Sequence, residues 1–198
     1  YVSKCLFNKC TITSGNGGAL CCTSATYFFV ESSSFFSCKT NSGQGGAIYF
    51  SNSNCLQSVL YAVCGNDCSS TNTGPFAYLI IQNTASSKNC ANYSTITRCV
   101  SDSSGGHYTL WLRYGKTYCP SVNMSMNKCL DITVVFTPFI ESRSVTSSSS
   151  YSTFTDNSYT RYGCIWCDSG GANYEIKSCN ILRNVEISGS YGTVFSRG

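Results

Sequence analysis

The chain has 198 residues, of which 42% are hydrophobic, 14% aromatic and only 11% charged, and its formal net charge is +4. That length allows one domain with a buried core, while the low charge excludes a disordered tail and a nucleic-acid-binding protein. Ser, Thr, Tyr, Gly and Asn abound whereas helix-forming residues are scarce, which favours strands. No apolar run reaches the roughly 18 residues of a membrane span. We therefore expect residues 1–198 to form a single all-β domain.

The N-terminal quarter of the chain contains a repeated motif. Phe7-Asn-Lys-Cys10 precedes Gly17-Gly-Ala-Leu20, and 28 positions later Phe35-Phe-Ser-Cys38 precedes Gly45-Gly-Ala-Ile48. Continuing at steps of 27–31 residues gives a marker column, which consists of Cys10, Cys38, Cys68, Cys99, Cys129, Asn157 and Asn184.

A repeat length of 27–31 residues fits either a leucine-rich repeat or a parallel β-helix. The Leu-x-x-Leu-x-Leu pattern of leucine-rich repeats is absent, and short β-rich pieces separated by Gly, Ser and Asn fit a β-helix. Seven copies predict about seven coils of short strands, stacked about 4.8 Å apart. Gly-Gly-Ala forms a sharp corner in this interpretation, because glycine lacks the side chain that would clash there. His107 then replaces a corner glycine, and the serines from Ser147 to Ser150 form a loop bulge on one coil.

Two further rows keep a constant distance from the marker column. Three residues before the markers, six of seven residues are apolar and are expected to face inward, while Gly65 indicates that the third repeat has slipped. This row is Phe7, Phe35, Gly65, Ile96, Met126, Phe154 and Ile181. One residue before the markers, every copy is polar and is expected to face solvent: Lys9, Ser37, Asp67, Arg98, Lys128, Asp156 and Arg183. Within this row we expect Asp67 to pair with Arg98, and Asp156 with both Lys128 and Arg183.

These motifs resemble the paired repeats of the chlamydial polymorphic outer membrane proteins and of similar trichomonad surface proteins. In those proteins Gly-Gly-Ala plus an aliphatic residue accompanies Phe-x-x-Asn, often with Cys at the Asn position. The matching segments are Gly17–Leu20, Gly45–Ile48 and Phe154–Asn157, with the Cys form in Phe7–Cys10 and Phe35–Cys38. The resemblance implies a right-handed parallel β-helix in a surface-exposed, adhesive or structural protein. It implies no catalytic residues, because the family motifs are scaffold motifs.

The 15 cysteines indicate an oxidising compartment, and their odd number leaves at least one thiol unpaired within the chain. Parallel side chains in register have the wrong dihedral angle for a disulfide, so we expect mostly free thiols in the marker column. Cys164 and Cys167 form a lone C-x-x-C without a second pair for zinc, which favours a structural role. Disulfides are expected among the other cysteines: Cys5, Cys21, Cys22, Cys55, Cys64, Cys90, Cys119 and Cys179.

Many β-helices are carbohydrate-active enzymes, whose sites need paired aspartates or clustered Asp ligands for Ca²⁺. The nine acidic residues are dispersed here, and Asp67 and Asp156, which share a repeat phase, are expected to lie three coils apart. His107 is the only histidine of the chain, and no nucleophile elbow accompanies it. We therefore expect no catalytic residues, no metal ion and no cofactor.

Two features concern the surface. Asn92 and Asn123 each begin an N-x-S glycosylation sequon, and their spacing of 31 residues places them on almost the same strand of successive coils. Four aromatic residues follow the expected Gly-Gly corners, and they form either part of the core or an exposed strip for glycans or proteins. They are Tyr49, Tyr78, Trp111 and Trp166.

These observations predict a non-enzymatic β-solenoid, extracellular or on the cell surface, with a structural or adhesive role in a surface or fibre-forming protein. The alternative is a carbohydrate-binding or carbohydrate-cleaving β-helix of the pectin-lyase type, which a groove with exposed aromatics and clustered carboxylates would favour. The open ends of a solenoid present unpaired strand edges, and neither end of this sequence has a charged or helical cap. The expected partners are flanking coils of a longer chain or further copies stacked end to end, besides surface glycans or proteins. No nucleic acid is expected as a partner.

Overall fold

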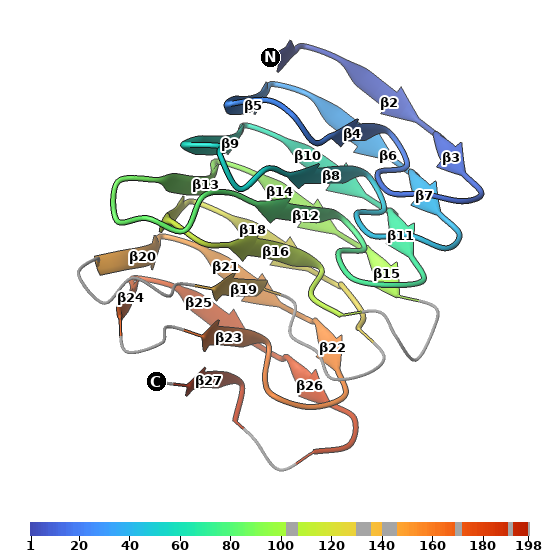
Figure 1. Ribbon diagram of the computed structural model, residues 1–198. Coiled ribbons are helices and arrows are strands. Elements are labelled where there is room, and N and C mark those ends of the chain that lie inside the picture. Colours follow the sequence, from blue (N-terminus) through green and yellow to red (C-terminus); the bar gives the residue numbers. More distant parts are fainter. Residues whose placement is uncertain (102–106, 130–135, 140–145, 169–171, 190–191, 198) are drawn as a thin grey trace.

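The chain folds as a parallel β-solenoid, with its two termini at opposite ends of the stack (Figure 1). The computed structural model describes residues 1–101, 107–129, 136–139, 146–168, 172–189 and 192–197. Within these ranges the chain forms strands, turns and bends and no helix, and therefore no helix that could cross a membrane. Seven strands in each of three sheets correspond to about six full turns. The predicted all-β solenoid of about seven coils is confirmed.

The strands stack in four layers, which we name sheets A to D in the order in which the chain visits them; every coil contributes a strand to each layer, except that the fifth coil joins sheet C only through bridges at Lys128. Sheet A contains β1 (Val2–Ser3), β5 (Tyr27–Glu31), β9 (Gln57–Tyr61), β13 (Lys88–Asn92), β17 (Lys116–Pro120), β20 (Thr146–Ser150) and β24 (Asn173–Lys177). Sheet B contains β2 (Leu6–Asn8), β6 (Ser34–Phe36), β10 (Cys64–Asn66), β14 (Thr95–Thr97), β18 (Asn123–Ser125), β21 (Thr153–Thr155) and β25 (Asn180–Leu182).

Sheets C and D complete the coil. Sheet C contains β3 (Thr11–Ile12), β7 (Lys39–Thr40), β11 (Ser69–Ser70) and β15 (Val100–Ser101), and bridges through Lys128 continue it to β22 (Ser158–Tyr159) and β26 (Val185–Glu186). Sheet D contains β4 (Leu20–Cys22), β8 (Ile48–Ser51), β12 (Ala77–Ile80), β16 (Leu110–Arg113), β19 (Phe136–Phe139), β23 (Ile165–Asp168) and β27 (Val194–Arg197).

Two corners of each coil consist of non-glycine residues in the left-handed backbone region. Between sheets A and B, φ is 45–54° at Lys4, Ser32, Ala62, Tyr93, Ser121, Tyr151 and Ser178. Between sheets B and C, φ is 51–56° at Lys9, Ser37, Asp67, Arg98, Met126, Asp156 and Arg183. Each such residue costs roughly 1–3 kcal/mol of strain. Stacking offsets this cost, because the backbone N–H of a corner residue donates to the next coil, as from Lys9 to Phe36 O at 2.8 Å.

The core side of sheet B explains the Phe-x-x-Asn repeat. An inward residue is followed by an outward one, then by the left-handed corner, and then by the small residue of the marker column. The inward row is Phe7, Phe35, Gly65, Ile96, Met124, Phe154 and Ile181. The prediction that Met126 belongs to this inward row is wrong. Met126 is a corner residue whose side chain is 46% exposed, and Met124 is the buried methionine of the row.

The third repeat does not slip, contrary to the sequence interpretation. Gly65 pairs in register with Phe35 and Ile96. The ring of Phe76 fills the space that a large side chain at Gly65 would need, since a Cβ built on Gly65 would lie 2.3 Å from that ring. Phe76 occupies the corner position held by Ala47 one coil earlier, because the next residue, Ala77, pairs with Ile48. A large residue and a small residue have thus exchanged places within one coil.

Glycine is required where corners of successive coils touch. A Cβ on Gly18 would lie 2.2 Å from the carbonyl oxygen of Gly46, and one on Gly46 would lie 2.1 Å from the carbonyl oxygen of Pro75. These distances are far below van der Waals contact, so no side chain fits between the stacked corners. The corner role predicted for Gly-Gly-Ala is confirmed.

The loop bulge predicted for the serine run is wrong. Ser147, Ser148, Ser149 and Ser150 belong to β20, whose residues alternate between buried and more exposed positions. Ser147 is fully buried, and its hydroxyl oxygen accepts the backbone N–H of Thr117 at 2.8 Å. Serine is small enough for the narrow interior and satisfies its own hydroxyl there, so this strand needs no large apolar residue.

Candidate functional site

The register of sheet C corrects the marker column. Val100 bridges to Lys128, which bridges to Ser158, so Asn127 rather than Cys129 follows Cys99 in the column. Cys129 is buried elsewhere, with its sulfur 3.0 Å from the Thr109 hydroxyl oxygen. We call the corrected set the inner column; its members are Cys10, Cys38, Cys68, Cys99, Asn127, Asn157 and Asn184.

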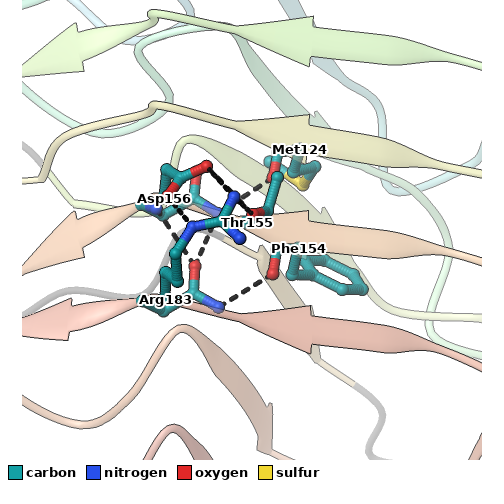
Figure 2. Close-up of polar contacts among 7 residues, drawn as sticks. Met124, Phe154, Thr155, Asp156 and Arg183 are labelled. Carbon is teal, nitrogen blue, oxygen red and sulfur yellow. Dashed lines mark hydrogen bonds and ion pairs between the residues drawn. The ribbon is translucent and has the colours of Figure 1, made fainter.

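The three asparagines of the inner column form a continuous hydrogen-bonded ladder. The side-chain oxygen of Asn157 accepts both the backbone N–H and the side-chain amide of Asn127, each at 3.0 Å. The side-chain amide of Asn157 donates to Met124 O at 2.9 Å and to Asn184 Oδ1 at 2.9 Å. Asn184 in turn donates to Phe154 O at 2.8 Å (Figure 2). The ladder therefore joins each coil to both of its neighbours.

The cysteines of the inner column occupy the same place with weaker bonds. The Cys68 thiol donates to Phe35 O at 3.5 Å, and the Cys38 thiol donates to Phe7 O at 3.7 Å. All 15 cysteines lie in the described ranges, and no disulfide joins any two of them. The disulfides predicted for the cysteines outside the column are therefore not formed. These are Cys5, Cys21, Cys22, Cys55, Cys64, Cys90, Cys119 and Cys179.

The corner row next to the inner column faces solvent as predicted, with one replacement. Met126 takes the place expected for Lys128, because the register shifts by two residues there. The guanidinium of Arg183 binds the Asp156 carboxylate with two hydrogen bonds of 2.7 Å and also reaches Thr155 (Figure 2). These bonds hold the pKa of Asp156 below its ordinary value.

The Asp67–Arg98 pair predicted in the same row is not formed. Asp67 instead accepts a hydrogen bond from the hydroxyl of Ser37 at 2.8 Å. The carboxylate thus bonds to the coil before it rather than to the coil after it.

The C-x-x-C cysteines point into the core. Cys164 and Cys167 are both buried, and burial raises the pKa of Cys167 to about 12. The Cys164 thiol donates to Asn184 Oδ1 at 3.5 Å, which links it to the Asn ladder. Among the described residues, no three His, Cys, Asp or Glu side chains are grouped as a metal site would need. The prediction that His107 replaces a corner glycine is wrong: the left-handed residue at this corner is Tyr108, with φ of 53°, and the carbonyl oxygen of His107 accepts the backbone N–H of Gly74 at 2.7 Å.

The predicted aromatic strip is a packed layer on the outer face of sheet D. Tyr49, Tyr78 and Trp111 pair in register, with ring centroids 5.5 Å apart for the tyrosines and 4.6 Å for Tyr78 and Trp111. Tyr162 covers Trp166 at 4.6 Å. Tyr78 and Trp166 are only 6% and 8% exposed. The strip therefore lies outside the solenoid core. Its rings cover one another, so Tyr78 and Trp166 present no flat exposed face to a ligand.

An exposed groove lies instead on the outer face of sheet A, where the sequence predicted only the glycosylation sequon of Asn92. It encloses about 430 Å³, and its lining includes Tyr27, Phe29, Val59, Tyr61 and Cys90. Tyr27 and Tyr61 are 61% and 41% exposed. The sequence does contain a signal for this groove. Four consecutive residues from Tyr27 are apolar or aromatic, and therefore both faces of β5 are apolar. A strand that is apolar on both faces needs cover or a partner on its outer side.

The two sequon asparagines do not share a strand. Asn92 ends β13 and pairs with Tyr61, whereas Asn123 begins β18 and pairs with Thr95. Asn123 is exposed and Asn92 is half-buried, with its side-chain amide group 3.1 Å from Tyr118 O. Glycosylation at either residue stays a prediction.

Comparisons with known proteins add no relative: no family model, no curated protein and no solved structure matches the chain.

Proposed function

We propose that the chain is a non-enzymatic structural or adhesive β-solenoid of an extracellular surface or fibre-forming protein. The observation that supports this proposal most directly is that the residues recurring from coil to coil are the ones that stabilise the stack. The inner column, the left-handed corners and the inward row of sheet B all stabilise the stack, while the side chains of the corner row, including the Asp156–Arg183 ion pair, face solvent. A repeat of this kind produces a rigid rod with a long lateral surface.

Burial makes the thiols compatible with an oxidising environment. Cys38, Cys68 and Cys99 are fully buried, and an oxidant reaches them only when the coils open. These buried thiols can therefore stay unbridged outside the cell for as long as the solenoid stays folded.

The proposed partners at the ends are further coils of the same polypeptide or a second copy. β1 and β24 are the outermost strands of sheet A and each has a sheet neighbour on one side only. Unpaired N–H and C=O groups at such an edge are ready to pair with another strand. Sedimentation over a range of concentrations tests this: association that grows with concentration is expected, and a concentration-independent monomer contradicts it.

A second candidate function is carbohydrate binding, and the groove on sheet A favours it. Tyrosine rings offer an apolar face to a sugar ring while their hydroxyl groups stay in water. In this candidate the solenoid adheres to a glycan through its side without cleaving it.

The non-enzymatic proposal is tested by incubating the folded protein with a panel of polysaccharides for a day. We expect retention on at least one immobilised polysaccharide or surface extract and no new reducing ends. A heat-unfolded sample serves as the control for adhesion. Reducing ends or unsaturated products that increase with protein concentration would show that the chain is an enzyme.

A further inference from the structure

The exposed tyrosines of the solenoid gather on one side of it. On sheet D the tyrosine rings are covered, as at Tyr78 with 6% exposure. The exposed tyrosines of the described ranges belong instead to the outer face of sheet A or to the corner between sheets A and B. They are Tyr1, whose ring packs on Phe29, and Tyr27, Tyr61, Tyr93 and Tyr151.

Two of these exposed rings touch each other across neighbouring coils. Tyr61 ends β9, and Tyr93 is the corner residue that follows β13. Their ring centroids lie 5.5 Å apart with 71° between the ring planes, so the edge of one ring faces the other. Within the described ranges, no other two of the exposed tyrosines are in ring contact.

The backbone on both sides fixes the position of this pair. Tyr61 pairs in register with Asn92, the residue before Tyr93. Tyr93 has a φ of 52°, and its N–H donates to Pro120 O at 3.0 Å. The equivalent corner residue of the preceding coil is Ala62, whose N–H donates to Asn92 O at 2.9 Å and whose side chain is only a methyl group. The two tyrosines are 41% and 59% exposed, so a dissolved oxidant reaches both phenols while the coils stay closed.

We propose that Tyr61 and Tyr93 are a site of oxidative cross-linking, which a haem peroxidase with hydrogen peroxide joins through a carbon–carbon bond. Each phenol loses one electron and its hydroxyl proton, and the two tyrosyl radicals combine at the ring carbons next to the oxygens. The hydrogen on each of these carbons then moves to the phenol oxygen, which restores both rings. Hydrogen peroxide takes up the electrons and protons and becomes water. Only side-chain rotation is needed to bring the two carbons together, because both rings are exposed.

The cross-link would tie the third coil to the fourth on the outside of the solenoid. This role rests on the proposed structural function in oxidising surroundings, and it goes beyond that function by assigning a covalent modification. The other exposed tyrosines offer no such partner within the chain. Tyr27 begins β5, whereas Tyr61 ends β9, which places them about 13 Å apart along the strands. Tyr151 lies two coils beyond Tyr93, about 10 Å along the axis, and Ser121 occupies the corner between them.

Treatment of the folded 198-residue chain with a haem peroxidase and hydrogen peroxide tests the proposal. The exposed thiols are alkylated first, because thiols quench tyrosyl radicals. Peptide mapping by mass spectrometry should identify one peptide pair joined through Tyr61 and Tyr93, lighter than the sum of its parts by two hydrogen atoms. Its yield per chain should not change on dilution, because the two rings are already held together.

Tyrosine-to-phenylalanine variants keep the ring and its packing but remove the hydroxyl group that is oxidised. In dilute protein, Tyr61→Phe and Tyr93→Phe should each lower the dityrosine fluorescence at least about tenfold. Tyr27→Phe and Tyr151→Phe are the matched controls, and both should fluoresce like the parent chain. The cross-linked chain should also unfold at a urea concentration higher by about 1 M, because the new bond closes a loop in the unfolded state.

The proposal is overturned if no peptide joins Tyr61 to Tyr93, if its yield falls in proportion to dilution, or if the variants of this pair fluoresce like the controls. A cross-link that leaves the urea midpoint unchanged would refute its role in holding the coils together. The structural and adhesive function would survive each of these outcomes, since retention on a polysaccharide and sedimentation test it separately.

Discussion

The inner column is built differently in the two halves of the solenoid. In the N-terminal half, the Cys68 thiol is a weak donor and bonds to Phe35 O of the coil before it at 3.5 Å. In the C-terminal half, the side-chain amide of Asn157 bonds to the coils on both sides, donating to Met124 O in the coil before it at 2.9 Å and to Asn184 Oδ1 in the coil after it at 2.9 Å. The backbone around both residues is the same, since each follows a left-handed corner residue with φ of 55°.

This difference shows what the position requires. The space is narrow and faces the core, so a small side chain is needed, and the nearby carbonyl oxygens favour a donor. Asparagine supplies a donor and an acceptor and so connects three coils, whereas cysteine supplies small volume and a weak donor. A substitution in the inner column should therefore lower the free energy of unfolding more in the half that contains asparagines than in the half that contains cysteines.

The largest effect is expected for Asn157→Ala. The substitution leaves the backbone N–H of Asn127 and the carbonyl oxygen of Met124 buried without these bonds, which should lower the free energy of unfolding by about 3 kcal/mol. Urea unfolding followed by circular dichroism measures the change. Asn123→Ala, at an exposed asparagine of β18, is the matched control and should change stability by less than about 0.5 kcal/mol. A loss at Asn157 no larger than that of the control would contradict the ladder.

A smaller effect should follow from raising the pH, because a buried thiol of the column resists ionisation. Hydrogen bonding to Cys68 and burial raise the pKa of Cys38 above its ordinary 9.0, so this thiol stays protonated in the folded chain after it has ionised in the unfolded chain. The stability it contributes is therefore complete below pH 9 and is lost as the pH rises further, by about 1 kcal/mol between pH 8 and pH 10. Urea midpoints in reducing buffer at the two pH values measure the loss. Cys38→Ala should reduce it, and an equal loss in parent and variant would refute the assignment to this thiol.

Cys68→Ala should cost about 1 kcal/mol, because it removes one buried sulfur and one weak hydrogen bond. Cys21→Ala, at an exposed cysteine of β4, should be nearly neutral. Thermal unfolding under reducing conditions compares the two. If Cys68→Ala cost as much as Asn157→Ala, the two halves of the column would not differ as described.

The smallest effect is expected on the solvent side of the corner. Arg183→Ala removes an ion pair with Asp156 in which both side chains are substantially exposed, so the free energy of unfolding should fall by less than it does for Cys68→Ala. The change should shrink further at high salt, because exposed charges are screened. A salt-independent loss above 1 kcal/mol would indicate that the pair is part of the stacking itself.

The fold could be predicted because the strongest constraints are local. Gly18 and Gly46 have no room for a side chain, and the three-residue step from Phe7 to Cys10 is fixed by one left-handed corner. Both constraints leave residue types at constant spacing in the sequence. The spacing between the motifs of the first two coils is therefore enough to predict the approximate length of the repeat.

The exact register in the fifth coil could not be predicted, because two alignments fit the sequence. Met124 with Asn127 and Met126 with Cys129 both have an apolar residue three positions before a small one. Only the pairing of Lys128 with its neighbours selects the first. The exchange between Gly65 and Phe76 was hidden for a related reason, since its two members lie on different sheets.

The groove was missed because outward-facing residues obey no common pattern. Tyr27, Phe29 and Tyr61 share a surface only through the register of β5 and β9, and their equivalents in other coils range from apolar to charged, including Cys, Asn, Pro, Ser, Lys and Glu. The repeat stabilises the rod and does not constrain this face. Sequence patterns therefore revealed the scaffold and not the candidate binding surface.

Thiol mapping by mass spectrometry tests the central claim, that buried, unbridged cysteines continue the asparagine ladder. The folded chain is alkylated without reductant, then unfolded without reductant and alkylated with a second reagent. We expect the first label on the exposed Cys5 and Cys21, and the second label on Cys38, Cys68 and Cys99. If the column cysteines are labelled only after reduction, or are labelled rapidly in the folded chain, the claim is wrong.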